Sequence, residues 1–363
     1  MKGRNLFFAT EKNIYDALHH KRITTSILSD ILLRKGIILC EETTKEELIE
    51  EVCRLPHCYE DLQSLKELVQ KYDQRESLTK VTLNTETTQN DLKKAIDIVK
   101  KIYATDKNGS ISLNANKDGS ILIDLNYQDI DLSKTELRQI DNRNVSIEFK
   151  LDDDKVNIRM PQTAKAREVV DLIQKQLSKI QDKSIDIFEI SLETIIQPNL
   201  RSQFFQDLMN GLTGYEVDDV TNVVLNRSGS EESDSDSDDE DQNIDTGFVK
   251  KAVLNGEGVN TSSIFSQLHN KGYYISRIAW SAIPENRIGD RIIVEAFFKN
   301  ADLCTDFSYN IKGINNQKGN EYNITIRPAN SLEKQKISEL IEISAEKAYY
   351  KIVSIEVDGH EKD

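Results

Sequence analysis

Three charged residues in the middle of the sequence have types and spacing that suit metal-dependent hydrolysis. Asp124 lies in a stretch of alternating apolar and polar residues, and Glu148 and Lys150 form a Glu-x-Lys pair in a later stretch of the same kind. Alternation with a period of two predicts strands whose polar side chains share one face. Carboxylate oxygens are the ligands that Mg²⁺ prefers, and a bound metal ion can activate water. An antiparallel sheet with one solvated face produces the same pattern, in which case these charges are only exposed.

The elements expected around these residues follow the order helix, three strands, an additional strand, helix and strand. This order resembles the core of the PD-(D/E)xK nucleases, in which an acid and the E-x-K pair hold a divalent cation and the lysine orients water. The resemblance implies a nuclease with Asp124, Glu148 and Lys150 as catalytic residues. The proline or second acid that usually precedes the first acid is absent before Asp124.

A second set of candidate residues is basic and lies near the start of the chain. The first 40 residues carry a net charge of +4, although the whole chain has a formal net charge of −15. The field close to a site matters more for phosphate binding than the total charge does. The residues expected to contact phosphates are Lys21, Arg22, Arg34, Lys35 and Lys45.

The stretch Ser26–Leu55 resembles the helix-extended-helix modules of the SAP and HeH/LEM-like families, which bind nucleic acid. Arg34 and Lys35 match the basic residues before the Gly-Leu of these families, and Gly36-Ile37 matches the Gly-Leu itself. Lys45 matches the lysine at the start of the second helix. The link between the two helices is longer than is usual, and several glutamates lie beside it. The resemblance implies phosphate contacts from these three basic residues, and a helical protein-docking module is the alternative.

Two other groups of residues invite a chemical interpretation. Cys40, Cys53, His57 and Cys58 suggest zinc, but their spacing contains no Cys-x₂-Cys pair. Cys40 and Cys53 occupy apolar positions, so we expect packing cysteines and no metal site. Trp280 could form a stacking platform for bases with its neighbours, although its position in a strand favours a place in the core.

Several common enzyme classes are excluded by the motifs that the sequence lacks. It contains no phosphate-binding loop, dinucleotide-binding fingerprint, nucleophile-elbow or zincin motif. We therefore expect no small-molecule cofactor, and Mg²⁺ only under the nuclease alternative.

The composition predicts a cytoplasmic protein of more than one domain. The chain has 363 residues, of which 38% are hydrophobic, and only four cysteines. It contains no apolar run of about 18 residues, and its first residues lack the apolar segment of a secretory signal, so we expect no membrane partner. The frequent Asn, Lys and Ile are typical of AT-rich genomes, which are often bacterial.

The low-complexity acidic stretch 227–244 marks the main boundary between the expected domains. Eight acids between Glu231 and Asp241 give it a charge of −8, and it has almost no apolar residues, so a disordered linker is predicted. The expected organisation is α+β throughout: a helical SAP-like module at 1–75, an α+β domain with a mainly antiparallel sheet at 78–226, the linker, and a second such domain at 245–363.

Local patterns predict the elements in more detail. Ser26 is expected to cap a helix that Gly36 ends, and Thr44 with Glu47 forms a capping box. Asp118-Gly119 predicts a hairpin between flanking strands. Residues 202–224 and 262–282 have a similar pattern: a short helix that ends at a Gly-Tyr pair, followed by a strand. Near the end of the chain we expect a helix over 332–349 and a strand over 352–357.

These observations favour a non-enzymatic nucleic-acid-binding or adaptor subunit of a larger complex, with other protein subunits as partners. Phosphate contacts would come from the helical module. The alternatives are the metal-dependent nuclease and a protein-only scaffold.

Overall fold

The computed structural model describes most of the chain, namely residues 9–40, 42–70, 76–106, 109–115, 119–227, 250–256, 258, 263–319 and 321–360. The chain forms two compact units, and each is built from segments that are separate in the sequence. The first unit contains Met1–Arg75, Glu86–Val156 and Thr163–Ile185. The second unit contains Glu76–Thr85, Asn157–Gln162 and Asp186–Asp363.

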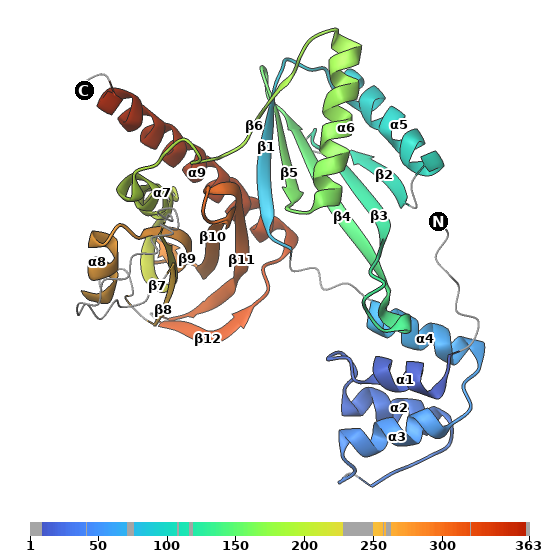
Figure 1. Cartoon of the computed structure of the whole chain (residues 1–363). Coiled ribbons are helices and arrows are strands. Elements are labelled where there is room, and N and C mark those ends of the chain that lie inside the picture. Colours follow the sequence, from blue (N-terminus) through green and yellow to red (C-terminus); the bar gives the residue numbers. More distant parts are fainter. Residues whose placement is uncertain are drawn as a thin grey trace, which may run out of the picture. The chain divides into compact units, whose positions relative to one another are not determined.

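The first unit begins with a helical module, which we define as the four helices α1 (Glu11–Leu18), α2 (Thr25–Arg34), α3 (Lys45–Arg54) and α4 (Tyr59–Gln70) (Figure 1). The capping box at Thr44 and Glu47 is present as predicted, and Gly36 follows α2 with a φ of 79°. The predicted cap at Ser26 is wrong, because Thr24 caps α2 by accepting a hydrogen bond from the Ile27 N–H. Apolar residues from all four helices form the core of this module.

The rest of the first unit combines a sheet with two helices. Strands β2 (Gly109–Ala115), β3 (Ile121–Ile130) and β4 (Ile140–Leu151) pair in sequence order and are antiparallel. The pairing of Leu113 with Ile123 confirms the hairpin predicted there. Helices α5 (Gln89–Asp106) and α6 (Ala164–Gln181) contact each other, and α5 also contacts β2. Alternate residues of β3 and β4 are fully buried, as expected for strands covered on one face. A short 3₁₀ helix, η1 (Glu136–Arg138), lies between β3 and β4.

The second unit contains a larger antiparallel sheet with the strand order β5-β1-β11-β10-β9-β7-β8, in which β6 also pairs with β1 and β12 with β11. Three of the strands precede α7: β1 (Leu78–Asn84), β5 (Val156–Pro161) and β6 (Asp186–Phe188). The others are β7 (Tyr215–Asn226), β8 (Lys251–Asn255), β9 (Tyr274–Pro284), β10 (Arg291–Asn300), β11 (Thr305–Lys318) and β12 (Glu321–Arg327). The helices of this unit are α7 (Pro198–Asn210), α8 (Ser263–Asn270) and α9 (Ser331–His360). Helices and mainly antiparallel strands in both units confirm the α+β class.

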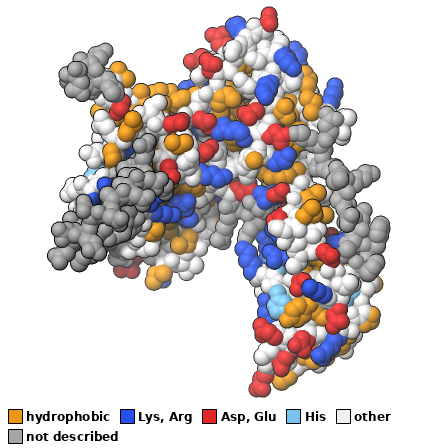
Figure 2. Space-filling model, in the orientation of Figure 1, with side chains coloured by type: hydrophobic (Ala, Val, Ile, Leu, Met, Phe, Trp, Pro, Cys, Tyr) orange, Lys and Arg blue, Asp and Glu red, His pale blue; other side chains and the backbone are white. Residues whose placement is uncertain are grey.

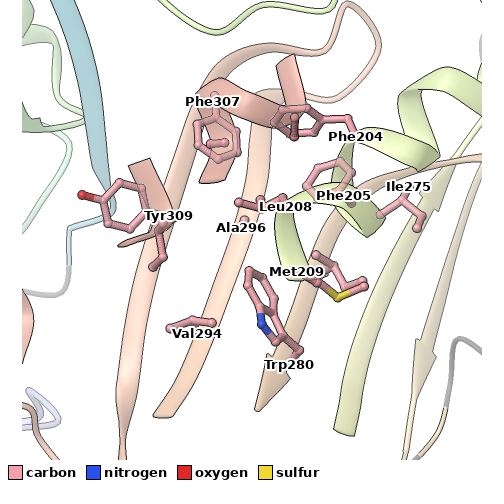
Figure 3. Close-up of a cluster of buried hydrophobic side chains, with 14 of the residues drawn as sticks. Phe204, Phe205, Leu208, Met209, Ile275, Trp280, Val294, Ala296, Phe307 and Tyr309 are labelled. Carbon is pink, nitrogen blue, oxygen red and sulfur yellow. The ribbon is translucent and has the colours of Figure 1, made fainter. Parts of the chain in front are cut away.

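Aromatic and aliphatic side chains together form the core of the second unit (Figure 3). Phe204 and Phe205 of α7 contact Phe298 of β10, with ring centroids 5.5 and 5.6 Å apart. Trp280 is completely buried, which confirms that it is a core residue and contradicts the stacking-platform alternative. Gly211 lets α7 approach α9, because a Cβ at this position would lie 2.3 Å from the Ser344 Oγ.

A partly buried ionic cluster attaches α9 to strands β5 and β1. Arg159 makes two hydrogen bonds to the Glu342 carboxylate, of 2.6 and 2.8 Å, and the Tyr309 hydroxyl donates to the same carboxylate at 2.5 Å. One helical turn later, Lys80 pairs with Glu346 at 2.6 Å. These contacts explain why residues 76–85 and 157–162 belong to the second unit rather than to the domain predicted over 78–226.

Two expectations about the second unit require correction. The strand predicted over 352–357 is wrong, because α9 continues through these residues. Ile352 extends the buried stripe of Ala345 and Ala348 along one face of the helix. Burial at this helical spacing outweighs the preference of the β-branched residues for a strand. The predicted acidic linker falls almost entirely on residues 228–249, which lie outside the described residues. However, Asn226 pairs with Lys251, so the segment connects adjacent strands β7 and β8 instead of joining two domains.

The two segments with a similar sequence pattern also have similar local structure. In both, a helix is followed by a glycine with positive φ, Gly214 or Gly272, and then by a strand. These strands, β7 and β9, are antiparallel neighbours in the sheet.

The pair formed by Arg159 and the buried Glu342 gives a prediction about stability. We expect Arg159→Met to lower the free energy of unfolding by about 3–5 kcal/mol, because it leaves the Glu342 carboxylate buried without its cation. The double variant Arg159→Met/Glu342→Gln should recover much of this loss, because the glutamine amide is uncharged and its oxygen can still accept the hydrogen bond from Tyr309. Denaturant-induced unfolding of the full chain measures both values, and a double variant less stable than Arg159→Met would contradict the explanation.

Candidate nucleic-acid interface

The turn between α1 and α2 gathers basic side chains from two separate segments. Lys21 and Arg22 belong to this turn, and Arg138 comes from η1 more than 100 residues later. All three cations are close enough to the imidazole of His20 to lower its pKa. We call Lys21, Arg22 and Arg138 the basic cluster. The sequence predicted the first two of these residues and missed the third.

Burial of Leu137 positions Arg138 in this cluster. Leu137 is 1% exposed and is part of the core of the helical module. The buried Gln70 side chain of α4 donates a hydrogen bond to the Leu137 carbonyl oxygen at 2.8 Å. The only feature of the sequence that could have indicated this contact was an apolar residue, Leu137, in a polar segment. It was ambiguous because Leu132 is also an apolar residue of this segment, yet its side chain is 76% exposed.

His20 has a pKa below the ordinary 6.5, first because it is partly buried and then because of Arg138, Arg22 and Lys21; Asp141 acts in the opposite direction. Its Nδ1 also accepts a hydrogen bond from the Arg22 N–H at 3.3 Å, which requires Nδ1 to be unprotonated. Since the unfolded chain binds a proton more readily than the folded chain, the contribution of His20 to stability is lost as the pH falls below about 6.5.

The ammonium group of Lys35 is bound by residues of the same module. The SAP resemblance implies instead that this group contacts phosphates. The Lys35 ammonium group donates to the Asp61 carboxylate and to the Pro56 carbonyl oxygen, both at 2.8 Å. This hydrogen bond from Lys35 lowers the pKa of Asp61 to about 2, although Asp61 is partly desolvated. Lys35 therefore joins the end of α2 to the start of α4.

Arg34 and Lys45 lie on either side of the link between α2 and α3. Arg34 is exposed and Lys45 is partly exposed. Helix α3 is acidic beyond Lys45, and its Arg54 pairs with Glu50 and Glu51 of the same helix. Figure 2 shows acidic and basic side chains side by side on the visible face of the helical module.

The three nuclease candidates lie on one face of the β3–β4 ladder. Asp124 is paired with Ser146, and Glu148 and Lys150 follow at alternate positions along β4. Both oxygens of the Asp124 carboxylate accept hydrogen bonds, from the Ser146 hydroxyl at 2.5 Å and from the Asn114 amide at 3.1 Å. Among the described residues, no three His, Cys, Asp or Glu side chains are grouped as metal ligands. The arrangement adds no support to the nuclease alternative.

Of the four residues that suggested zinc, three lie together in the helical module and Cys40 does not lie with them. Cys53 is buried, as predicted, whereas the prediction that Cys40 packs in a core is wrong because Cys40 is exposed. Cys53, His57 and Cys58 line a cavity of about 310 Å³ in the helical module, together with Glu11 and apolar residues. The His57 Nε2 is 2.8 Å from the Val52 carbonyl oxygen, which ties the ring to the end of α3.

The chain has no recognisable relatives in two comparisons with known proteins. No protein family description matches the sequence, and no curated protein is detectably similar to it. Within the described ranges, no helix is both long and apolar enough to cross a membrane.

The surroundings of His20 give a prediction that tests the basic cluster directly. We expect Arg138→Gln to raise the pKa of His20 toward 6.5, because it removes a nearby cation. Titration of the His20 imidazole followed by NMR measures this shift. Arg54→Gln is the matched control and should leave the His20 pKa unchanged, since Arg54 pairs within α3. Equal pKa values in the wild type and in Arg138→Gln would contradict the proximity of these residues.

Proposed function

We propose that this protein is a nucleic-acid-binding subunit that contacts phosphates through the basic cluster. The observation that carries the proposal is that η1 packs against α1 and α4 through the buried Leu137, which brings Arg138 to the turn that contains Lys21 and Arg22. Three cations gathered by the fold produce a local positive potential on a chain whose net charge is −15. Phosphate groups are the ligands that such a potential favours.

The distribution of charge within the helical module also supports this assignment. Helix α3 carries four glutamates, and Lys35 is paired with Asp61. A polyanion would be repelled by the acidic side of the module. The turn between α1 and α2 is therefore a better position for phosphates than the α2–α3 link that the SAP resemblance suggested.

A protein-docking role is the second candidate, and one observation favours it. Leu33, Ile38 and Leu39 are 58%, 82% and 37% exposed around the α2–α3 link. Apolar side chains grouped on a surface are typical of protein contacts. This surface is compatible with an adaptor that binds another protein subunit while the basic cluster holds nucleic acid.

The salt dependence of binding tests the proposed function. The variant has three substitutions in the basic cluster: Lys21→Gln, Arg22→Gln and Arg138→Gln. We expect the slope of log K against log salt to become shallower by roughly two to three, since each lost phosphate contact contributes about 0.7 for single strands and 0.9 for duplexes. Affinity should fall to a similar extent for all sequences. Fluorescence anisotropy with single- and double-stranded DNA and RNA, with and without Mg²⁺, provides the measurement.

The control removes the same charge from another part of the first unit. Its substitutions are at three exposed lysines of α6 and the residues after it: Lys175→Gln, Lys179→Gln and Lys183→Gln. This variant should retain the wild-type slope. Absence of binding at low salt would contradict the proposed function and favour protein docking alone. Binding with an equal slope in the wild type and the cluster variant would place the phosphate contacts elsewhere.

A further inference from the structure

The face of the β3–β4 ladder that α5 and α6 leave open carries an ordered row of amide side chains. Asn126 is directly opposite Asn144, and Gln128 is opposite Asn142. Within each pair, one amide donates to the other: Asn144 to Asn126 at 2.7 Å, and Gln128 to Asn142 at 3.1 Å. All four side chains are exposed. We call these two pairs the amide ladder.

Each pair retains hydrogen-bonding capacity for a ligand. An amide has two N–H donors and an oxygen that accepts, and each cross-strand bond uses only one donor and one acceptor site. Asn126 keeps its own NH₂ group, and Asn144 keeps its oxygen and one N–H. The cross-strand bond restricts the rotation of both side chains, so these groups are held in position before any ligand binds.

The amide ladder leads toward the basic cluster within the first unit. Beyond the pair of Gln128 and Asn142, the next pair on the same face is Ile130 with Ile140. The intervening segment, residues 131–139, contains Arg138 of the basic cluster. A chain whose phosphates are held at the basic cluster can therefore extend along the ladder without crossing to another unit.

The spacing and charge of the amide ladder limit what it can bind. Successive pairs on one face are about 6.8 Å apart, because a strand rises about 3.4 Å per residue. This is about twice the 3.4 Å separation of stacked bases in a duplex strand, so bases over successive pairs must be unstacked. The four amides are uncharged and suit base edges rather than phosphates. Asn and Gln bind adenine through a donor and an acceptor together.

We propose that the amide ladder reads the base edges of single-stranded nucleic acid, with a preference for adenine. The inference rests on the proposed function, since the basic cluster supplies the phosphate contacts and the ladder supplies selectivity. Unpaired bases present the edges that side chains read in single-stranded RNA, and the same edges are present in single-stranded DNA. The ladder itself contains no aromatic side chain, so it contributes to the choice of base more than to overall affinity.

The test compares binding of oligoadenylate and oligopyrimidine strands, as both DNA and RNA, to the full chain. The wild type should bind oligoadenylate about 100-fold more tightly than oligopyrimidine, in line with about tenfold from one bidentate amide contact at each of the two pairs. In Asn126→Ala/Asn144→Ala this ratio should fall to about tenfold, while the salt dependence stays at the wild-type value. Gln128→Ala/Asn142→Ala should reduce the ratio in the same way. A preference found in only one of the two nucleic acids identifies the natural ligand as DNA or RNA and supports the inference.

The control is Asn90→Ala, an exposed asparagine in the first turn of α5. It should retain the adenine preference, and far-UV circular dichroism should show that all variants are folded. A wild type without base preference, or ladder variants with the wild-type preference, would overturn the inference while leaving salt-dependent binding intact. Failure of the wild type to bind any strand at low salt would instead overturn the proposed function, and the inference with it.

Discussion

The candidate interface depends on the packing of Leu137 into the core of the helical module. Residues 131–139 connect β3 to β4, and without this anchor they would form an ordinary exposed loop. Burying a leucine side chain contributes about 1.5–3 kcal/mol, and the hydrogen bond from Gln70 satisfies the carbonyl oxygen of the same residue. One apolar contact thereby places Arg138 beside Lys21 and Arg22. The same contact fixes the end of the β3–β4 ladder against the helices.

The electrostatics of the chain follow from where each charge is paired. Lys35 neutralises Asp61, Arg54 pairs within α3, and Arg159 neutralises a carboxylate inside the second unit. Paired charges contribute to folding and have little field at a distance. The basic cluster brings like charges together, and these cations add to the partial burial that lowers the pKa of His20. Accumulation of like charge weakens the folded state slightly, and a bound anion would remove that cost.

Local features were predictable from the sequence because they depend on neighbouring residues. Thr44 and Glu47 form their capping box within one helical turn, and the hairpin at Gly119 needs only a tight turn between alternating strands. Arg138 and the partner of Lys35 could not be predicted, since each depends on a contact between segments distant in the sequence. The strand predicted over 352–357 was wrong for a related reason: its β-branched residues are helical because Ile352 packs in the core of the second unit.

The pairing of β7 with β8 shows that the acidic segment is an insertion between two adjacent strands rather than a linker between domains. A linker between independent domains would leave its two ends free to separate, but here Arg227 donates a hydrogen bond to the Lys250 carbonyl oxygen and Asn226 pairs with Lys251. The two ends are therefore held together by the sheet. The entropic cost of closing a loop grows only slowly with its length, so a long acidic insertion is tolerated between adjacent strands. Residues on both sides of the insertion build one core, and β1 and β5 contribute to the same unit through Lys80 and Arg159. Cutting the chain at the acidic segment would consequently divide a folded unit and leave charged residues of β1 and β5 without their partners on α9.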